Sequence, residues 1–202
     1  WANPPAVVDK ITNVPGSDIL TGKATGPAKA IAAGAPGSPF AAQRIGPFGS
    51  AFSPTHGDQL FVSNAHDGAN AGSVSVYDVA GDGGLSAISG SPFADFQTAP
   101  CWVAISPDGR ALFAVNTGAG SVSRYGIAAD GTLTLAGSTP MTGSGLRAFD
   151  AAVSPDGAFL YVVDAGAAAV SAFAVHGTSL DELPGSPVAI PGGVAPFGMV
   201  VD

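Results

Sequence analysis

The sequence is poor in charge and nearly free of cysteine. Only 11% of its 202 residues are charged, and 15 acidic against 7 basic residues give a formal net charge of −8. No run of Lys or Arg could follow a phosphate backbone or an anionic membrane, so neither nucleic acid nor a membrane is an expected partner. The single cysteine, Cys101, excludes an internal disulfide framework and has no zinc-type spacing around it. We therefore expect no metal and no cofactor, and the cellular compartment stays undetermined.

Long apolar runs and helical periodicity are missing as well. No segment approaches the roughly 20 apolar residues that span a bilayer, and none keeps a 3.6-residue period over a dozen residues. Apolar residues still make up 46% of the chain, which is enough to build a sizeable core in one soluble domain. The 29 Gly and 17 Pro are typical of short strands joined by tight turns. The composition therefore predicts an all-β fold.

A Ser-Pro motif flanked by apolar strands occurs three times. Its prolines, Pro54, Pro107 and Pro155, lie 53 and 48 residues apart. In the turn after Ser, Pro fixes φ, Asp can bond its own backbone, and Gly accepts a positive φ. A second apolar strand, an alternating third strand and a short outer strand complete each copy. Each copy begins with a short apolar run, predicted as the inner strand, at residues 48–52, 101–105 and 149–153.

Four antiparallel strands in each repeat are typical of a propeller blade, so the predicted fold class is an all-β β-propeller. A β-sandwich explains the strand lengths but not the repetition. The phrase Gly-Ser-Pro, which recurs after each outer strand, is interpreted as the link to the next blade. We expect a single domain over residues 1–202, divided into a partial blade at 1–36, blade repeats at 37–89, 90–137 and 138–185, and a final inner strand at 186–202.

The two ends of the chain leave the number of blades open. Residues 193–201 are predicted as a fourth inner strand, whereas residues 1–36 can hold only the other three strands of a blade. Three complete blades and a split one amount to about four. The last strand either closes a four-bladed ring with the first three, or the chain is part of a larger ring completed by an N-terminal segment or a second copy.

The stretch APCWVAISPDGRALFAVNTGAGSVSRYGIAADGTLTLAG, residues 99–137, resembles the lactonase family of seven-bladed β-propellers. This family includes 6-phosphogluconolactonase-like and carboxymuconate-cyclase-like proteins. The resemblance extends from Gly37 to the C-terminus. It implies that the chain is the C-terminal portion of a seven-bladed ring, and that the activity is the opening or formation of a lactone.

The family's usual polar residues are not found in these repeats. By the resemblance, enzymes of the family often carry a His after the Pro that opens the inner strand, and an Arg after the Asn that ends the second strand. If these groups exist, the resemblance places them in other blades. The first position instead holds Phe48, Cys101, Phe149 and Phe197, and the second holds Ala65, Thr117 and Ala165.

Two residues are predicted to be catalytic. In a propeller, the loop that enters the inner strand and the loop that leaves the second strand meet around the central channel. His66 lies in such a loop, where it could act as a general base while Asp67 holds its tautomer. Arg147 lies in a loop that enters an inner strand, where it could bind a substrate carboxylate or stabilise an oxyanion. The competing interpretations are a solvated loop at His66 and an ion pair of Arg147 with Asp150 or another carboxylate.

Further residues of the same loops are predicted to contact a substrate. Asn64, Asn116 and Asp164 share one phase of the repeat, where they could bind Ca²⁺, although capping of the strand end is favoured. Cys101 is expected to be buried rather than nucleophilic. The predicted substrate-binding residues are Arg44, Phe48, Asn116, Phe149, Asp164 and Phe197.

Two functions from different classes follow from these residues. The first is a lactonase- or cyclase-like enzyme that acts on a small lactone or carboxylated substrate at the central channel. The second is a non-catalytic propeller that presents a rigid face to a protein, a glycan or a small ligand. The sequence leaves open whether the protein is an enzyme, and its expected partners are a small-molecule substrate or a protein.

Overall fold

The computed structural model describes residues 35–143, 147–193 and 195–201. Among these residues, no helix is long and apolar enough to cross a membrane. They belong to two compact units, of which residues 42–79 and 86–201 form the larger, and residues 35–41 and 80–85 the smaller. The predicted partial blade at 1–36 lies almost entirely outside the described residues.

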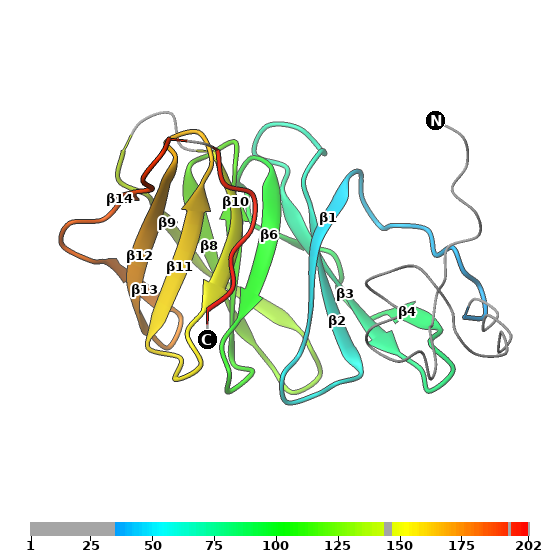
Figure 1. Ribbon diagram of the computed structural model, residues 1–202. Coiled ribbons are helices and arrows are strands. Elements are labelled where there is room, and N and C mark those ends of the chain that lie inside the picture. Colours follow the sequence, from blue (N-terminus) through cyan, green and yellow to red (C-terminus); the bar gives the residue numbers. More distant parts are fainter. Residues whose placement is uncertain (1–34, 144–146, 194, 202) are drawn as a thin grey trace, which may run out of the picture. The chain divides into compact units, whose positions relative to one another are not determined.

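The strands form three antiparallel sheets, which follow one another along the chain (Figure 1). The first sheet contains β1 (Pro47–Phe52), β2 (Gln59–Asn64), β3 (Ser73–Val79), β4 (Leu85–Ala87) and β5 (Phe93–Ala94). The second contains β6 (Pro100–Ile105), β7 (Ala111–Asn116), β8 (Ser121–Ile127) and β9 (Leu133–Pro140). The third contains β10 (Ala148–Val153), β11 (Phe159–Asp164), β12 (Ala169–His176), β13 (Ser179–Glu182) and β14 (Val188–Ala189). Each sheet has four antiparallel strands in order, and in the first and third sheets a two-residue strand, β5 or β14, also pairs with the third strand of the sheet. The prediction of four-stranded antiparallel sheets is confirmed.

The predicted Ser-Pro turns form for the expected reason. In the second sheet, Asp108 Oδ1 accepts hydrogen bonds from Ser106 Oγ at 2.6 Å and from the Arg110 amide at 3.1 Å. Gly109 follows with φ of 70°, which only glycine adopts without strain. The Ser106 hydroxyl bond is the main reason why the pKa of Asp108 lies below its usual value. We call this end of the sheets the turn end and the opposite end, where β1, β6 and β10 begin, the entry end.

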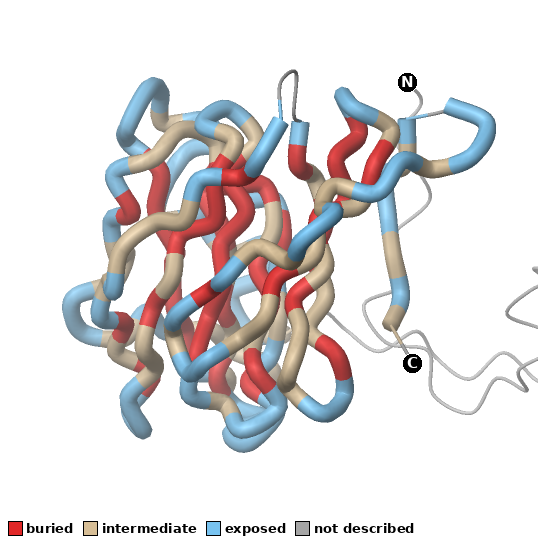
Figure 2. Tube along the Cα trace, turned by 90° about the vertical axis from the view of Figure 1, so that its left-hand side faces the viewer, coloured by how far each residue is buried: buried red, intermediate tan, exposed pale blue. Residues whose placement is uncertain are grey.

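The core lies between neighbouring sheets, and the second sheet is covered on both faces. Strand β7 alternates between the two sides: Leu112 packs in the cluster shared with the first sheet, and Phe113 in the cluster shared with the third. The inner strands also contact one another, β1 with β6 and β6 with β10. Figure 2 shows the resulting pattern, with buried residues in the strands and exposed ones in the turns. Sheets that bury their broad faces against their neighbours, with the first strands adjacent, are arranged as propeller blades.

The interpretation of Gly-Ser-Pro as a link between blades is wrong. Both β4 and β5 pair with β3, and both β13 and β14 pair with β12, so the phrase lies within the outer edge of a sheet. Where the outer strand is interrupted, Ser91 Oγ accepts the Val76 amide at 2.8 Å, and Ser186 Oγ accepts the Ala172 amide at 3.0 Å. The serine therefore replaces a missing ladder bond.

The segment at 195–201 differs from the predicted fourth inner strand because it forms no ladder with a neighbouring strand. It runs past β10 (red in Figure 1) and contacts this strand through single interactions. The Met199 amide donates to Asp150 Oδ2 at 2.8 Å, and the rings of Phe149 and Phe197 lie 5.1 Å apart.

Replacement of Gly49 by alanine is expected to lower the free energy of unfolding by about 1 to 3 kcal/mol, because it overpacks the contact between β1 and β6. A Cβ atom at Gly49 would lie 2.6 Å from Trp102 Cα and 2.7 Å from the Cys101 carbonyl oxygen, and backbone cannot give way as a side chain can. Chemical denaturation measures the change. The matched control is Gly57→Ala, where a Cβ meets nothing within 4 Å. Equal stability of the two variants would contradict the close approach of the sheets.

Candidate functional site

A β-bulge lies near the entry end of each inner strand. In the third sheet, Ala148 pairs with Asp164 and Asp150 with Val163, which leaves Phe149 as the extra residue. The registers of β1 and β6 shift at the corresponding places. Bulges bend a strand and re-aim a side chain, and they are common at the rims of barrels and next to active sites.

One cation and two aromatic rings form a cluster around the bulge of the third sheet. The Arg147 guanidinium carbon lies 5.6 Å from the centroid of the Phe149 ring, within the range of a cation–π contact. The Phe149 ring in turn lies 5.1 Å from Phe197, at an interplanar angle of 32°. Phe197 is 71% exposed, so this cluster presents apolar surface and a positive charge to solvent. We call these three residues the aromatic platform.

Arg147 has an aromatic partner, and Asp150 has backbone partners. Asp150 is buried, and its Oδ1 and Oδ2 accept the amides of Ala151 at 2.7 Å and Met199 at 2.8 Å. The ion pair between Arg147 and Asp150, the competing interpretation of Arg147, is not found. Within the part of the chain that the structure describes, Arg147 forms no ion pair and is therefore available to an anion.

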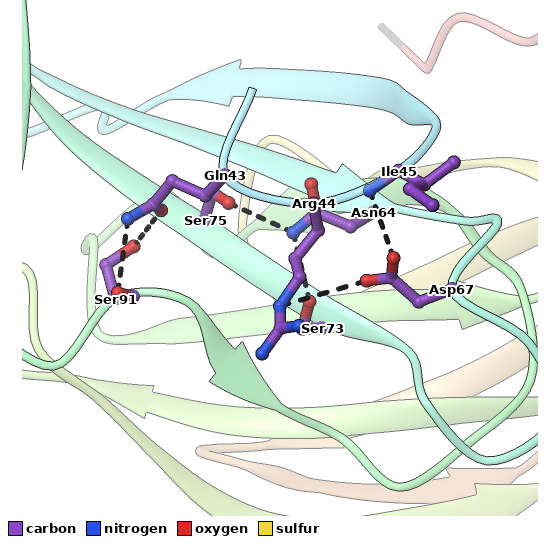
Figure 3. Close-up of polar contacts among 8 residues, drawn as sticks. All are labelled: Gln43, Arg44, Ile45, Asn64, Asp67, Ser73, Ser75 and Ser91. Carbon is purple, nitrogen blue, oxygen red and sulfur yellow. Dashed lines mark hydrogen bonds and ion pairs between the residues drawn. The ribbon is translucent and has the colours of Figure 1, made fainter. Parts of the chain in front are cut away.

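The first sheet places a second group of polar side chains at its entry end (Figure 3). Asp67 Oδ1 accepts the Ile45 amide at 3.0 Å, and its Oδ2 lies 3.9 Å from Arg44 Nε. The Asp67 side chain is only 12% exposed, whereas that of Arg44 is 57% exposed. Asp67 thus ties two loops together, and no hydrogen bond joins it to His66.

His66 lies in the loop after β2 and is exposed. Its amide donates to the Ile45 carbonyl, and its ring packs against Gly46, where a Cβ would lie 2.6 Å from the ring carbon Cγ. The other two histidines, His56 and His176, lie at the turn end of the first and third sheets. His66 is therefore the histidine of the entry end. It stands on the first sheet and Arg147 at the start of the third, and no hydrogen bond joins these two predicted residues, so their joint role stays a prediction.

Asn64, Asn116 and Asp164 occupy equivalent buried positions between the sheets. Asn64 Nδ2 donates to Ser73 and Ser75, each at 3.0 Å, and Asn116 Nδ2 donates to Ser121 at 3.1 Å and Ser123 at 2.8 Å. Asp164 Oδ2 instead accepts the Ser171 hydroxyl at 2.6 Å. In each of the three side chains, Oδ1 is buried and has no hydrogen-bond partner among the residues that the structure describes. These residues fasten the second strand of each sheet to the third, and a substrate contact at Asn116 or Asp164 stays a prediction.

Asp164 differs from the two asparagines by its ionisable group. Burial raises the pKa of the Asp164 carboxyl to about 6, the Ser171 hydroxyl opposes the rise, and the negative charge of Glu182 adds to it. Among the described residues, no three His, Cys, Asp or Glu side chains converge as metal ligands.

Sequence reasoning missed Asp95, which is 2% exposed. Its carboxylate accepts the Gln97 amide at 2.9 Å and the Ser123 hydroxyl at 3.2 Å, and it therefore joins the first sheet to the second. Burial raises the pKa of Asp95, with these hydrogen bonds opposing the rise. An isolated acidic residue just beyond an outer strand carries no local signal of burial, because the partner Ser123 lies 28 residues away.

Of the remaining residues singled out in the sequence, Phe48 is exposed and Cys101 is buried. Phe48 is 52% exposed at the entry end of β1. Cys101 is buried as expected, and burial raises the pKa of its thiol.

A pocket of about 430 Å³ lies at the turn end between the second and third sheets, and none of the predicted site residues lines it. Its carboxylates, Asp108 and Asp156, are engaged in their own turns, so we place the candidate site at the entry end.

Comparison with known proteins shows the family to which the chain belongs. Three blade-like sheets with adjacent inner strands are those of a β-propeller, and the family described as Lactonase, 7-bladed beta-propeller matches residues 51–197. The chain belongs to this family. The predicted fold class and the resemblance are both confirmed. None of the curated proteins matches the chain in sequence.

Solved structures with the same fold include a proposed 6-phosphogluconolactonase of Bacteroides fragilis, with a TM-score of 0.67 and 18% identity over 78% of this chain and 48% of that chain. A second, from Bacteroides uniformis, has a TM-score of 0.63 and 19% identity over 73% of this chain and 45% of that one. The periplasmic gluconolactonase of Pseudomonas aeruginosa has a TM-score of 0.60 and 29% identity over 73% and 43%. The chain thus spans less than half the length of each of these proteins.

Proposed function

We propose that the chain supplies part of the entry-end surface of a propeller that hydrolyses a small lactone carrying an anionic group. The observation that carries the proposal is the aromatic platform: Arg147, which forms no ion pair within the described residues, lies beside the Phe149 ring, and Phe149 lies beside Phe197. The lactonase family and the two kinds of lactonase named among the similar structures support the choice of a sugar lactone.

The platform fits the chemistry of such a substrate. A sugar ring has apolar C–H faces that pack on aromatic rings, here Phe149 and Phe197. A guanidinium binds a carboxylate or phosphate through two parallel hydrogen bonds, and no carboxylate of the described residues pairs with Arg147. The bulge holds the Phe149 ring beside the Arg147 guanidinium, so that one ligand can contact both groups.

The proposed reaction is the addition of water to the lactone carbonyl carbon. His66 takes a proton from the attacking water, the bond from the carbonyl carbon to the ring oxygen breaks, and that oxygen receives the proton. The product is an open-chain hydroxy acid. Because His66 and Arg147 stand on the first and third sheets, the ligand has to extend across the channel between them.

The rest of the binding surface belongs to other blades in this proposal. A further segment or a second copy of the chain would complete the ring. Both arrangements are compatible with a chain that spans less than half the length of these structural relatives.

Replacement of Arg147 by alanine tests the proposal. We expect the KM for 6-phosphogluconolactone to rise roughly 10- to 100-fold, because a charge-assisted contact is lost, while gluconolactone without phosphate is affected less. Steady-state hydrolysis of both lactones measures the difference. The matched control is Arg110→Ala, since Arg110 is exposed at the turn end. An equal change for both lactones would rule out Arg147 as the anion contact.

One observation favours a non-catalytic binding function as the second candidate. At the bulge, where enzymes of the family often carry a His, the described copies have Phe48, Cys101 and Phe149. If the protein binds the hydrolysis product at the platform but turns over neither lactone, the binding function replaces the enzymatic one.

A further inference from the structure

Asp150 links the two halves of the aromatic platform. Its Oδ1 accepts the amide of Ala151, which lies two residues after the bulge residue Phe149. Its Oδ2 accepts the amide of Met199, two residues after Phe197 and 49 residues away in the sequence. One buried carboxylate therefore holds both the strand that carries the first ring and the segment that carries the second.

The segment with Phe197 is bound to β10 through few described contacts. Residues 195–201 form no strand, and Phe197 and Val200 are 71% and 83% exposed. The described contacts of this segment with β10 are the ring pair and the bond from Met199 to Asp150. A carboxylate that accepts a backbone amide makes a charge-assisted bond, which is stronger than a bond between neutral groups.

The corresponding positions of the other inner strands carry no carboxylate. Gly49 and Trp102 stand in β1 and β6, and Gly198 stands in the segment itself. In the first sheet, the amide of Gly49 itself donates to the Ser63 hydroxyl at 3.0 Å, and no carboxylate takes part. The bulge by itself therefore does not require an aspartate, and the link to Met199 is what distinguishes the third sheet.

We infer that Asp150 is a positioning residue of the binding site, which holds Phe197 against Phe149 so that the two rings and Arg147 act as one surface. This inference rests on the proposed function for its effect on substrate. The position of the segment itself can be measured without substrate.

Two variants remove the same contact from opposite sides. Asp150→Asn weakens the acceptor, and Met199→Pro removes the donor because proline has no amide hydrogen. In Asp150→Asn we expect hydrogen exchange at the Met199 amide to accelerate roughly 10- to 100-fold, as for loss of a charge-assisted bond. Each single variant should raise the KM for 6-phosphogluconolactone by at least about 10-fold with kcat little changed, because uniform binding is lost. The exposed Asp130→Asn is the matched control.

The double variant Asp150→Asn/Met199→Pro separates positioning from general destabilisation. If the two residues act through one contact, the KM of the double variant equals that of the more affected single variant. Fully multiplied effects, or an unchanged Met199 exchange rate in Asp150→Asn, would overturn the inference. If the wild-type protein hydrolyses neither lactone, the proposed function fails, and the exchange measurement still decides the role of Asp150.

Discussion

Replacement of Asp164 by asparagine is expected to stabilise the fold by about 3 kcal/mol above pH 7 and to change stability little at pH 4. The pKa of this carboxyl rises from 3.8 to about 6 on folding, and each unit corresponds to about 1.4 kcal/mol. Asp164 has no exposed surface, so solvent screening does not reduce the effect. The folded state binds the proton more tightly than the unfolded state, and stability therefore falls as the pH rises from about 4 to about 6.

Asparagine suits the position because the other two sheets already use it there. Asn116 Nδ2 donates to Ser121 and Ser123, and the hydroxyl of Ser171 can accept a hydrogen bond as readily as donate one. The substitution removes the charge that burial and Glu182 disfavour. It preserves the size of the side chain.

Denaturant unfolding at pH 4, 6 and 8 measures the difference between the wild type and Asp164→Asn. Asp58→Asn, at an exposed turn, controls for a general change in net charge. A gain of equal size at all three pH values would contradict the raised pKa of Asp164, and a loss at pH 8 would show that the carboxylate is stabilised in the folded protein.

Replacement of His66 by alanine is expected to lower kcat for lactone hydrolysis by roughly 10²- to 10⁴-fold, the range for loss of a general base or acid. The imidazole is proposed to move the proton from water to the leaving ring oxygen. Substrate binding is assigned to the platform on another sheet, so KM should change little. The structure gives His66 no carboxylate partner, because Asp67 bonds to Ile45 and pairs with Arg44.

Steady-state kinetics with gluconolactone test this role, with His176→Ala as the control. His176 is exposed at the turn end of the third sheet, away from the proposed site. A rate for His66→Ala equal to that of the control would remove His66 from the mechanism. A rise in KM at constant kcat would give it a binding role instead.

The elements that the sequence predicts correctly are those that local chemistry determines. Ser106, Asp108 and Gly109 form their turn from contacts within a few residues, and β7 is the predicted apolar strand because both of its faces are covered. The inner strands agree with the predicted ranges to within a residue because each is a short apolar run before such a turn.

The features that sequence reasoning missed depend on register and on distant partners. The bulge at Phe149 exists only in relation to the pairing of β10 with β11. Gly-Ser-Pro resembles a linker until the serine hydroxyl is seen to accept an amide of the third strand. The sequence suggests an ion pair of Asp150 with the nearby Arg147. The Asp150 carboxylate instead accepts the amide of Met199, which lies 49 residues away.

Titration of ¹⁵N-labelled protein with 6-phosphogluconate, the proposed reaction product, locates the ligand site directly. We expect the largest amide shifts at Arg147, Phe149 and Phe197, and we expect Arg147→Ala to abolish them. Shifts confined to the turn-end pocket at Asp108 and Asp156, or no shifts at saturating product, would contradict a binding site at the aromatic platform.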